Sequence, residues 1–135
     1  MTEPAIRELP ITGDDDVVRV RQLTRTYAQQ VKLSLVDQTK LVTAASELAR
    51  NTLLHGGGGS VSIEVVADGG RAGVRAVFRD EGPGIEDVAL AMTDGWTSGN
   101  GLGLGLSGAR RLVDEFDLAT AAGTGTTVTV VKWGR

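Results

Sequence analysis

The chain of 135 residues contains no cysteine, which excludes disulfide bonds, thiolate nucleophiles and thiolate metal ligands. Its single histidine, His55, makes a zinc site built on imidazole ligands improbable. The three lysines are Lys32, Lys40 and Lys132, and each follows a residue other than glycine. Because a Walker-type phosphate loop needs a lysine after its last glycine, that loop is excluded.

Long apolar runs and a strong excess of charge of one sign are also missing. No run approaches the roughly 18 residues of a membrane span, and residues 1–9 lack the basic-then-apolar layout of a signal peptide. A net charge of -3 gives no electrostatic case for binding nucleic acid. We therefore expect a cytoplasmic protein without membrane or nucleic-acid partners, folded as one domain over residues 1–135.

Glycine, in contrast, is abundant. Five of the 19 glycines stand at alternate positions in two clusters, Gly82 and Gly84, then Gly101, Gly103 and Gly105. Glycine allows positive φ angles and a close approach of the backbone to a ligand. An acidic residue precedes the first cluster and a helix start follows the second. This arrangement suggests one ligand with a base at one end and a phosphate chain at the other.

Hydrophobic periodicity predicts the elements around these clusters. Period-two alternation favours an edge strand over 5–11, a hairpin with strands over 60–66 and 72–79, and a last hairpin with strands over 118–121 and 126–133. Helical spacing favours a helix from residue 14, a helix from the cap at 34 to glycines 56–59, a short helix over 86–92 and a helix over 105–116. The order predicts an α+β fold, a two-layer sandwich of a mostly antiparallel sheet with helices on one face.

Two local features have alternative explanations. Asp14, Asp15 and Asp16 are typical of an N-cap and first helical turn; a cation site is the weaker alternative, because no carboxylates follow at calcium-loop spacing. Residues 103–108 match the dinucleotide pattern G-x-G-x-x-G. However, a polar loop rather than a strand precedes them, and no acidic residue after Asp117 is available to hold a ribose.

Four motifs in order carry a more specific signal. Glu47 and Asn51 stand one helical turn apart, D-x-G-x-G (80–84) follows a predicted strand, G-x-G-x-G (101–105) precedes a helix, and GTGT (123–126) precedes the last strand. Together they resemble the N, G1, G2 and glycine-threonine boxes of the GHKL ATPase/kinase superfamily. More narrowly, the sequence is similar to RsbT-type serine/threonine kinases of bacterial stressosome partner-switching modules in SELARN (46–51), DEGPGI (80–85), GLGLGL (101–106), RLVDEF (111–116) and KW (132–133).

The chemistry of these side chains agrees with the roles that the resemblance implies. Asn51 offers a neutral hard oxygen to Mg²⁺, and Glu47 is placed as general base for the attacking hydroxyl. Asp80 can accept from the exocyclic amine of adenine. Arg50 contacts phosphate or the acceptor protein, or else forms a surface ion pair, and His55 is more typical of a helix end than of a catalyst. The remaining predicted nucleotide contacts are Gly82, Gly84, Ile85, Gly101, Leu102, Gly103, Leu104, Gly105, Leu106 and Thr126.

The resemblance implies an ATP- and Mg²⁺-dependent kinase that phosphorylates a serine or threonine of a STAS-domain antagonist or scaffold. The kinase is then released to activate a downstream phosphatase or other signalling regulator, and weak homodimers are suggested. An anti-sigma factor kinase that sequesters a sigma factor, or a non-kinase ATP-binding switch, are the alternatives. A catalytic fragment of a sensor histidine kinase is disfavoured because His55 lies beside the nucleotide helix. Trp96 is a candidate lid residue, or else packs against the sheet.

Overall fold

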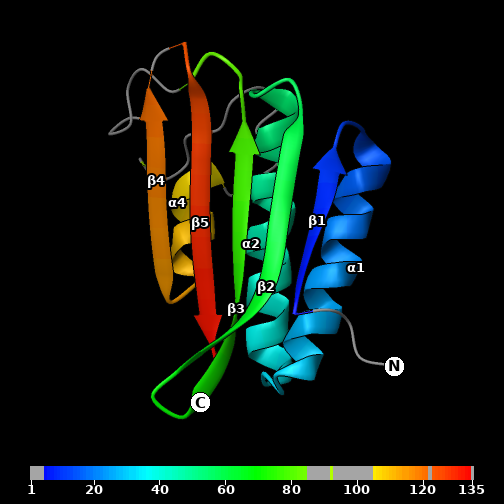
Figure 1. Cartoon of the computed structure of the whole chain (residues 1–135), viewed down its shortest axis with the longest axis vertical. Coiled ribbons are helices and arrows are strands. Elements are labelled where there is room, and N and C mark those ends of the chain that lie inside the picture. The colour runs from blue at the N-terminus through cyan, green and yellow to red at the C-terminus, as the bar shows by residue number, and fades with distance from the viewer. Residues whose placement is uncertain (1–4, 85–91, 93–104, 122, 135) are drawn as a thin grey trace.

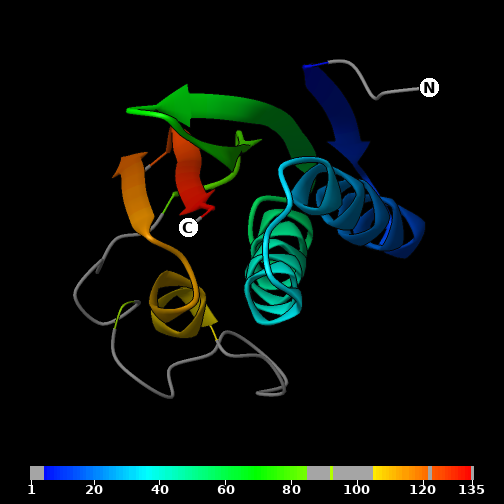
Figure 2. The ribbon, with the colours of Figure 1, turned by 90° about the horizontal axis from the view of Figure 1, so that it is seen from below.

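In the part of the chain that the structure describes, a five-stranded antiparallel sheet and three helices form two layers (Figures 1 and 2). The computed structural model describes residues 5–84, 92, 105–121 and 123–134. The strands are β1 (Ile6–Ile11), β2 (Gly59–Asp68), β3 (Arg71–Asp80), β4 (Glu115–Ala121) and β5 (Gly125–Trp133), in the order β1-β2-β3-β5-β4. The helices α1 (Asp14–Gln30), α2 (Leu35–Leu54) and α4 (Gly105–Arg111) cover one face, as Figure 2 shows. The predicted fold class is confirmed.

Local chemistry accounts for the turn between β2 and β3. Gly69 and Gly70 both have positive φ angles, 56° and 84°. Two successive residues of this kind form the primed hairpin turns whose twist matches that of paired strands. The strands on either side pair from Gly59 with Asp80 to Asp68 with Arg71. The hairpin predicted from the sequence is therefore present, and it brings the end of β3 beside the start of β2.

The two long helices differ in the side-chain hydrogen bonds at their N-termini. For α2 the predicted cap is confirmed, because Ser34 Oγ accepts a hydrogen bond of 3.1 Å from the Asp37 amide. For α1 the predicted N-cap position is wrong: Gly13 is the N-cap, and the three aspartates occupy the first turn. Asp16 is the third helical residue, and its carboxylate accepts from the amide and hydroxyl of Thr12 at 2.8 and 3.0 Å. These bonds, led by the one from the amide, lower the pKa of Asp16.

The helix predicted over 105–116 ends earlier than its periodicity suggests. α4 stops at Arg111, and Phe116 belongs to β4. The Asp114 amide donates to the Val131 carbonyl at 2.9 Å, and the Asp114 carboxylate accepts from the Trp133 amide at 2.7 Å. Pairing with β5 therefore replaces helical hydrogen bonds in this segment. The predicted helix over 86–92, apart from Met92, and the predicted lid residue Trp96 lie outside the described residues.

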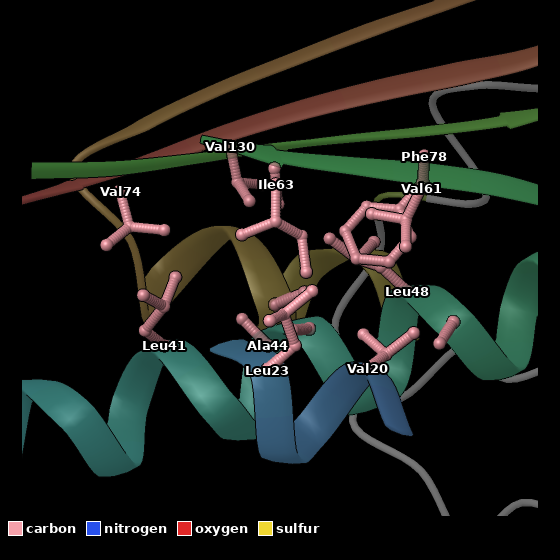
Figure 3. Close-up of a cluster of buried hydrophobic side chains, with 14 of the residues drawn as sticks. Val20, Leu23, Leu41, Ala44, Leu48, Val61, Ile63, Val74, Phe78 and Val130 are labelled. Carbon is pink, nitrogen blue, oxygen red and sulfur yellow. The ribbon is translucent and has the colours of Figure 1, made fainter. Parts of the chain in front are cut away.

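The hydrophobic core fills the space between the layers (Figure 3). Helices α1, α2 and α4 and strands β1, β2, β3 and β5 supply its buried side chains, among them Val20, Leu23, Leu41, Ala44, Leu48, Val61, Ile63, Val74, Phe78 and Val130. Burial of these side chains is the main stabilising contribution. Within the described part of the chain, no helix is both long and apolar enough to cross a membrane.

One charged group is buried at the end of β5. Lys132 is 5% exposed, and its ammonium lies 3.6 Å from a carboxylate oxygen of Asp37 and 3.7 Å from one of Asp114. A buried ammonium needs opposite charge close by to offset its loss of hydration. The group therefore links β5 both to the start of α2 and to the segment after α4. The opposite end of the sheet carries Asp80, at the end of β3, and Thr126, near the start of β5.

Candidate nucleotide site

Three elements that carry predicted motifs converge at one end of the sheet, the upper end in Figure 1. They are the end of α2, the end of β3 and the start of β5. In the strand register, Asp80 is paired with Gly59 on one side and with Thr126 on the other. Because residues 80 and 126 belong to neighbouring strands, cross-strand pairing brings the aspartate and the threonine of two separate motifs side by side.

The end of α2 packs directly on Asp80 through a glycine. A Cβ atom added to Gly56 would lie 2.3 Å from both Cβ and Cγ of Asp80. A Cβ added to Gly82 would in turn lie 2.7 Å from Cα of Gly56. Both distances are far below van der Waals contact, so neither position accepts a side chain without a backbone shift. The Asp80 carboxylate also accepts a hydrogen bond of 2.9 Å from the Gly82 amide, which fixes its orientation.

The hairpin between β4 and β5 is attached to the turn that follows Asp80. Gly125 has a φ of 95°, and a Cβ there would lie 2.1 Å from the Asp80 carbonyl oxygen. The Gly123 amide donates to the Pro83 carbonyl at 2.8 Å. The first glycine cluster and the glycine-threonine motif are therefore held against each other. Gly84, with a φ of 78°, ends this turn in a conformation that favours glycine.

Glu47 and Asn51 lie on the last turns of the same helix, four residues apart and hence on one face. The Glu47 side chain is 12% exposed and lies 3.4 Å from the Arg50 guanidinium, whose side chain is 53% exposed. Arg50 thus forms the ion pair that the sequence left open as an alternative to a phosphate contact. Within the part of the chain that the structure describes, the Asn51 side chain has no hydrogen-bond partner, so its amide oxygen is available to a ligand.

Other predicted contacts are placed only in part. Gly105 begins α4 with a φ of 70°, and Leu106 is 3% exposed with its side chain in the core, so only its backbone is left to meet a ligand. Ile85, Gly101, Leu102, Gly103 and Leu104 lie outside the described residues. His55 is the C-cap residue of α2, and its amide donates to the Asn51 carbonyl at 2.9 Å. This position agrees with the helix-end interpretation.

Sequence reasoning missed two residues of this site. Gly56 was expected only to end the helix, although it also makes room for Asp80. The sequence patterns assign no role to Thr120, yet its hydroxyl lies 3.0 Å from that of Thr126. The signal for Thr120 is the register of the last hairpin, in which residue 120 of β4 pairs with residue 126 of β5. No local signal identified the contact of Gly56, which depends on how the helix crosses the sheet.

Comparison with known proteins agrees with this geometry. The model of the family described as "Histidine kinase-, DNA gyrase B-, and HSP90-like ATPase" matches residues 36–133. The solved RsbU and RsbW domains of a Mycobacterium tuberculosis protein share the fold, with a TM-score of 0.66 and 24% identity over 96% of this chain and 32% of that one. The chain therefore belongs to this family of ATP-binding domains.

Sequence relatives narrow the assignment. The chain is 47% identical to the serine/threonine-protein kinase RsbT of Bacillus subtilis strain 168, over 89% of this chain and 90% of the relative. It is 27% identical to an anti-sigma F factor of Thermoanaerobacter strain X514, over 84% of this chain and 82% of that relative. Within the ATPase family, the chain is a serine/threonine-protein kinase of the RsbT type.

Proposed function

We propose that this protein transfers the γ-phosphoryl group of ATP to a serine or threonine of a STAS-domain antagonist or scaffold protein. The observation that carries the proposal is the contact between Gly56 and Asp80. This contact attaches the helix that bears Glu47 and Asn51 to the strand end that would bind the base. A single nucleotide could then reach from the strand end to the helix face, with its base at Asp80 and its phosphates near Asn51.

At the base end, Asp80 acts as a hydrogen-bond acceptor. One carboxylate oxygen accepts from the Gly82 amide at 2.9 Å, which leaves the other oxygen for a ligand donor. Adenine presents an amine at position 6, whereas guanine presents a carbonyl there. A carboxylate fixed in this way favours adenine because it attracts the amine and repels the carbonyl oxygen.

At the phosphate end, Asn51 would contribute one oxygen ligand to Mg²⁺. Among the described residues there is no group of three or more histidine, cysteine, aspartate or glutamate side chains that could hold a metal. Mg²⁺ commonly keeps several waters and is held by one or two protein oxygens together with substrate phosphates. The ion, when bound, would neutralise phosphate charge. The amide of Asn51, which has no hydrogen-bond partner among the described residues, suits this role, and the glycines of 101–105 would offer backbone amides.

Glu47 is the group proposed to accept the proton of the attacking hydroxyl. In the transfer, the acceptor oxygen forms a bond to the γ-phosphorus, its proton passes to the Glu47 carboxylate, and the bond from the γ-phosphorus to the ADP oxygen breaks. Arg50, 3.4 Å from the carboxylate, restrains the side chain on the helix face. Glu47 is also one turn away from Asn51, so the base and the metal ligand share one face.

The regulatory part of the proposal rests on family membership. Phosphorylation adds a charge of about -1.5 to -2 to the partner, which disrupts an interface by desolvation and repulsion. Release would free the kinase to activate a downstream phosphatase or other regulator, in the cytoplasm, where ATP is present. Weak self-association into homodimers is part of the same proposal. Similarity to anti-sigma F factors supports a second candidate, in which the protein also sequesters a sigma factor.

The decisive test is transfer of labelled γ-phosphate from ATP and Mg²⁺ to a purified STAS-domain protein encoded nearby. We expect wild type to label serine or threonine, and Glu47→Gln to label it about 10² to 10⁴ times more slowly, the usual effect of losing a general base. Glu64→Gln is the matched control because Glu64 pairs with Arg75 on the sheet. ATP binding without transfer to any STAS protein would refute the kinase proposal and favour an ATP-binding switch. Capture of a sigma factor by wild type would support the second candidate.

A further inference from the structure

Three side chains form a row across neighbouring strands at the proposed adenine end. Thr120 of β4 pairs with Thr126 of β5, and Thr126 pairs with Asp80 of β3. Phe78 and Val128, two positions away on β3 and β5, are buried in the core. Since alternate residues of a strand point to the same face, Asp80 and Thr126 also face the helices. The Asp80 carboxylate and the Thr126 hydroxyl therefore lie on the same, helix-facing side of the sheet.

The proton of each hydroxyl can be assigned from its neighbours. Thr120 Oγ1 lies 3.1 Å from the Gly125 carbonyl oxygen, which can only accept, so Thr120 donates its single proton there. Thr120 Oγ1 also lies 3.0 Å from Thr126 Oγ1. Distance alone allows either hydroxyl to donate in this second bond; with the Thr120 proton placed on the Gly125 carbonyl, the donor is Thr126. The Thr126 hydroxyl then has no proton left and can offer a ligand only its lone pairs.

We infer that Thr120 selects for a 6-aminopurine by making Thr126 a hydrogen-bond acceptor toward the base. The inference rests on the proposed function, which puts adenine at Asp80. The 6-amino group of adenine has two N–H donors, and the row offers two acceptors: the Asp80 carboxylate and, directly or through one water, the Thr126 hydroxyl. A 6-oxopurine places an oxygen against both acceptors. Thr120 is a positioning residue in this scheme because it acts through Thr126.

The test is the preference for ADP over IDP, whose base differs by a 6-oxo group and a protonated N1. Both affinities are measured by calorimetry with Mg²⁺. In Thr120→Val, the Thr126 hydroxyl is free to turn and donate to the 6-oxo oxygen. We expect the ADP preference to fall about 2- to 10-fold, the range of one neutral hydrogen bond. Thr120→Ser restores the hydroxyl and should keep the wild-type preference.

Two further variants separate specificity from general damage. Thr127→Val replaces the next residue of β5, on the other face of the strand, and should leave the preference unchanged. Thr126→Val should lower the preference, and adding Thr120→Val to it should lower it no further, because the two residues act as one unit. Additive losses in the double variant would show that Thr120 does not act through Thr126, and would overturn the inference.

The remaining outcomes distinguish this inference from the proposed function. If folded Thr120→Val kept the wild-type preference, the inference would be wrong and the nucleotide site would still stand. If wild type bound ADP and IDP equally, or bound neither, the placement of adenine at Asp80 would fail and the inference would fail with it. Thermal unfolding of each variant identifies any that is not folded, and Thr120→Ser then decides whether the hydroxyl matters.

Discussion

Replacing Gly56 with alanine tests the contact that joins the helix of the proposed catalytic residues to the base-binding strand. The new Cβ would lie 2.3 Å from Cβ and Cγ of Asp80, about 1 Å inside ordinary contact at 3.4 Å. Rotation of the Asp80 side chain would move Cγ but not Cβ, so the end of α2 or of β3 has to shift by about 1 Å. Gly56 is not among the described glycines with positive φ, so the change adds bulk without backbone strain.

The expected consequence is weaker nucleotide binding in a folded protein. A shift of this size separates Asp80 from the adenine amine, and a hydrogen bond to a charged group contributes about 1.5 to 3 kcal/mol. ADP affinity should therefore fall about 10- to 150-fold. Overpacking should also lower the free energy of unfolding by about 1 to 3 kcal/mol. Calorimetry with ADP and chemical denaturation measure the two effects separately.

Gly57→Ala is the matched control in the same turn. Gly57 has a φ of 71°, but a Cβ there would meet nothing within 4 Å. This variant should lose about 1 to 2 kcal/mol of stability through left-handed strain and keep its ADP affinity. If Gly56→Ala bound ADP as tightly as wild type, or if Gly57→Ala lost as much affinity, the proposed coupling between α2 and Asp80 would be refuted.

Three further variants test single side chains. Asp80→Asn should retain the bond from the Gly82 amide but weaken ATP binding by about 1.5 to 3 kcal/mol, and unchanged affinity in calorimetry would contradict the adenine assignment. Asn51→Ala should abolish the gain in ATP affinity that Mg²⁺ gives and leave binding in EDTA intact; full transfer at ordinary Mg²⁺ would disprove that role. Asp16→Asn should destabilise the protein at neutral pH. Because hydrogen bonds lower the folded pKa of Asp16 below 3.8, its contribution is present above that pH and lost as the pH falls through the folded value. Denaturation curves that stayed equally separated down to that range would refute this account.

Much of the fold followed from patterns only a few residues long. Ser34 caps α2 as predicted, and Gly69 with Gly70 closes the predicted hairpin. Such features depend on the geometry of one turn, so the local sequence contains the information needed to predict them. Two local predictions were wrong at their edges. Gly13 rather than an aspartate caps α1, because the carboxylate of Asp16 reaches back to Thr12. α4 ends early because the segment that follows it forms hydrogen bonds with β5.

For the candidate site, too, some features could be predicted from the sequence and others depend on the tertiary structure. The sequence by itself determined which residue types are present at the site: an acidic residue before alternate glycines, a glutamate and an asparagine one turn apart, and a threonine after the last glycines. Only the tertiary structure decided which of them meet. The strand order placed Thr120, Thr126 and Asp80 in one row, and the crossing of α2 over the sheet put Gly56 against Asp80. The physical reason is that strand register and helix placement are set by burial of side chains far apart in the chain, such as Leu48 and Val130, and no short pattern records those contacts.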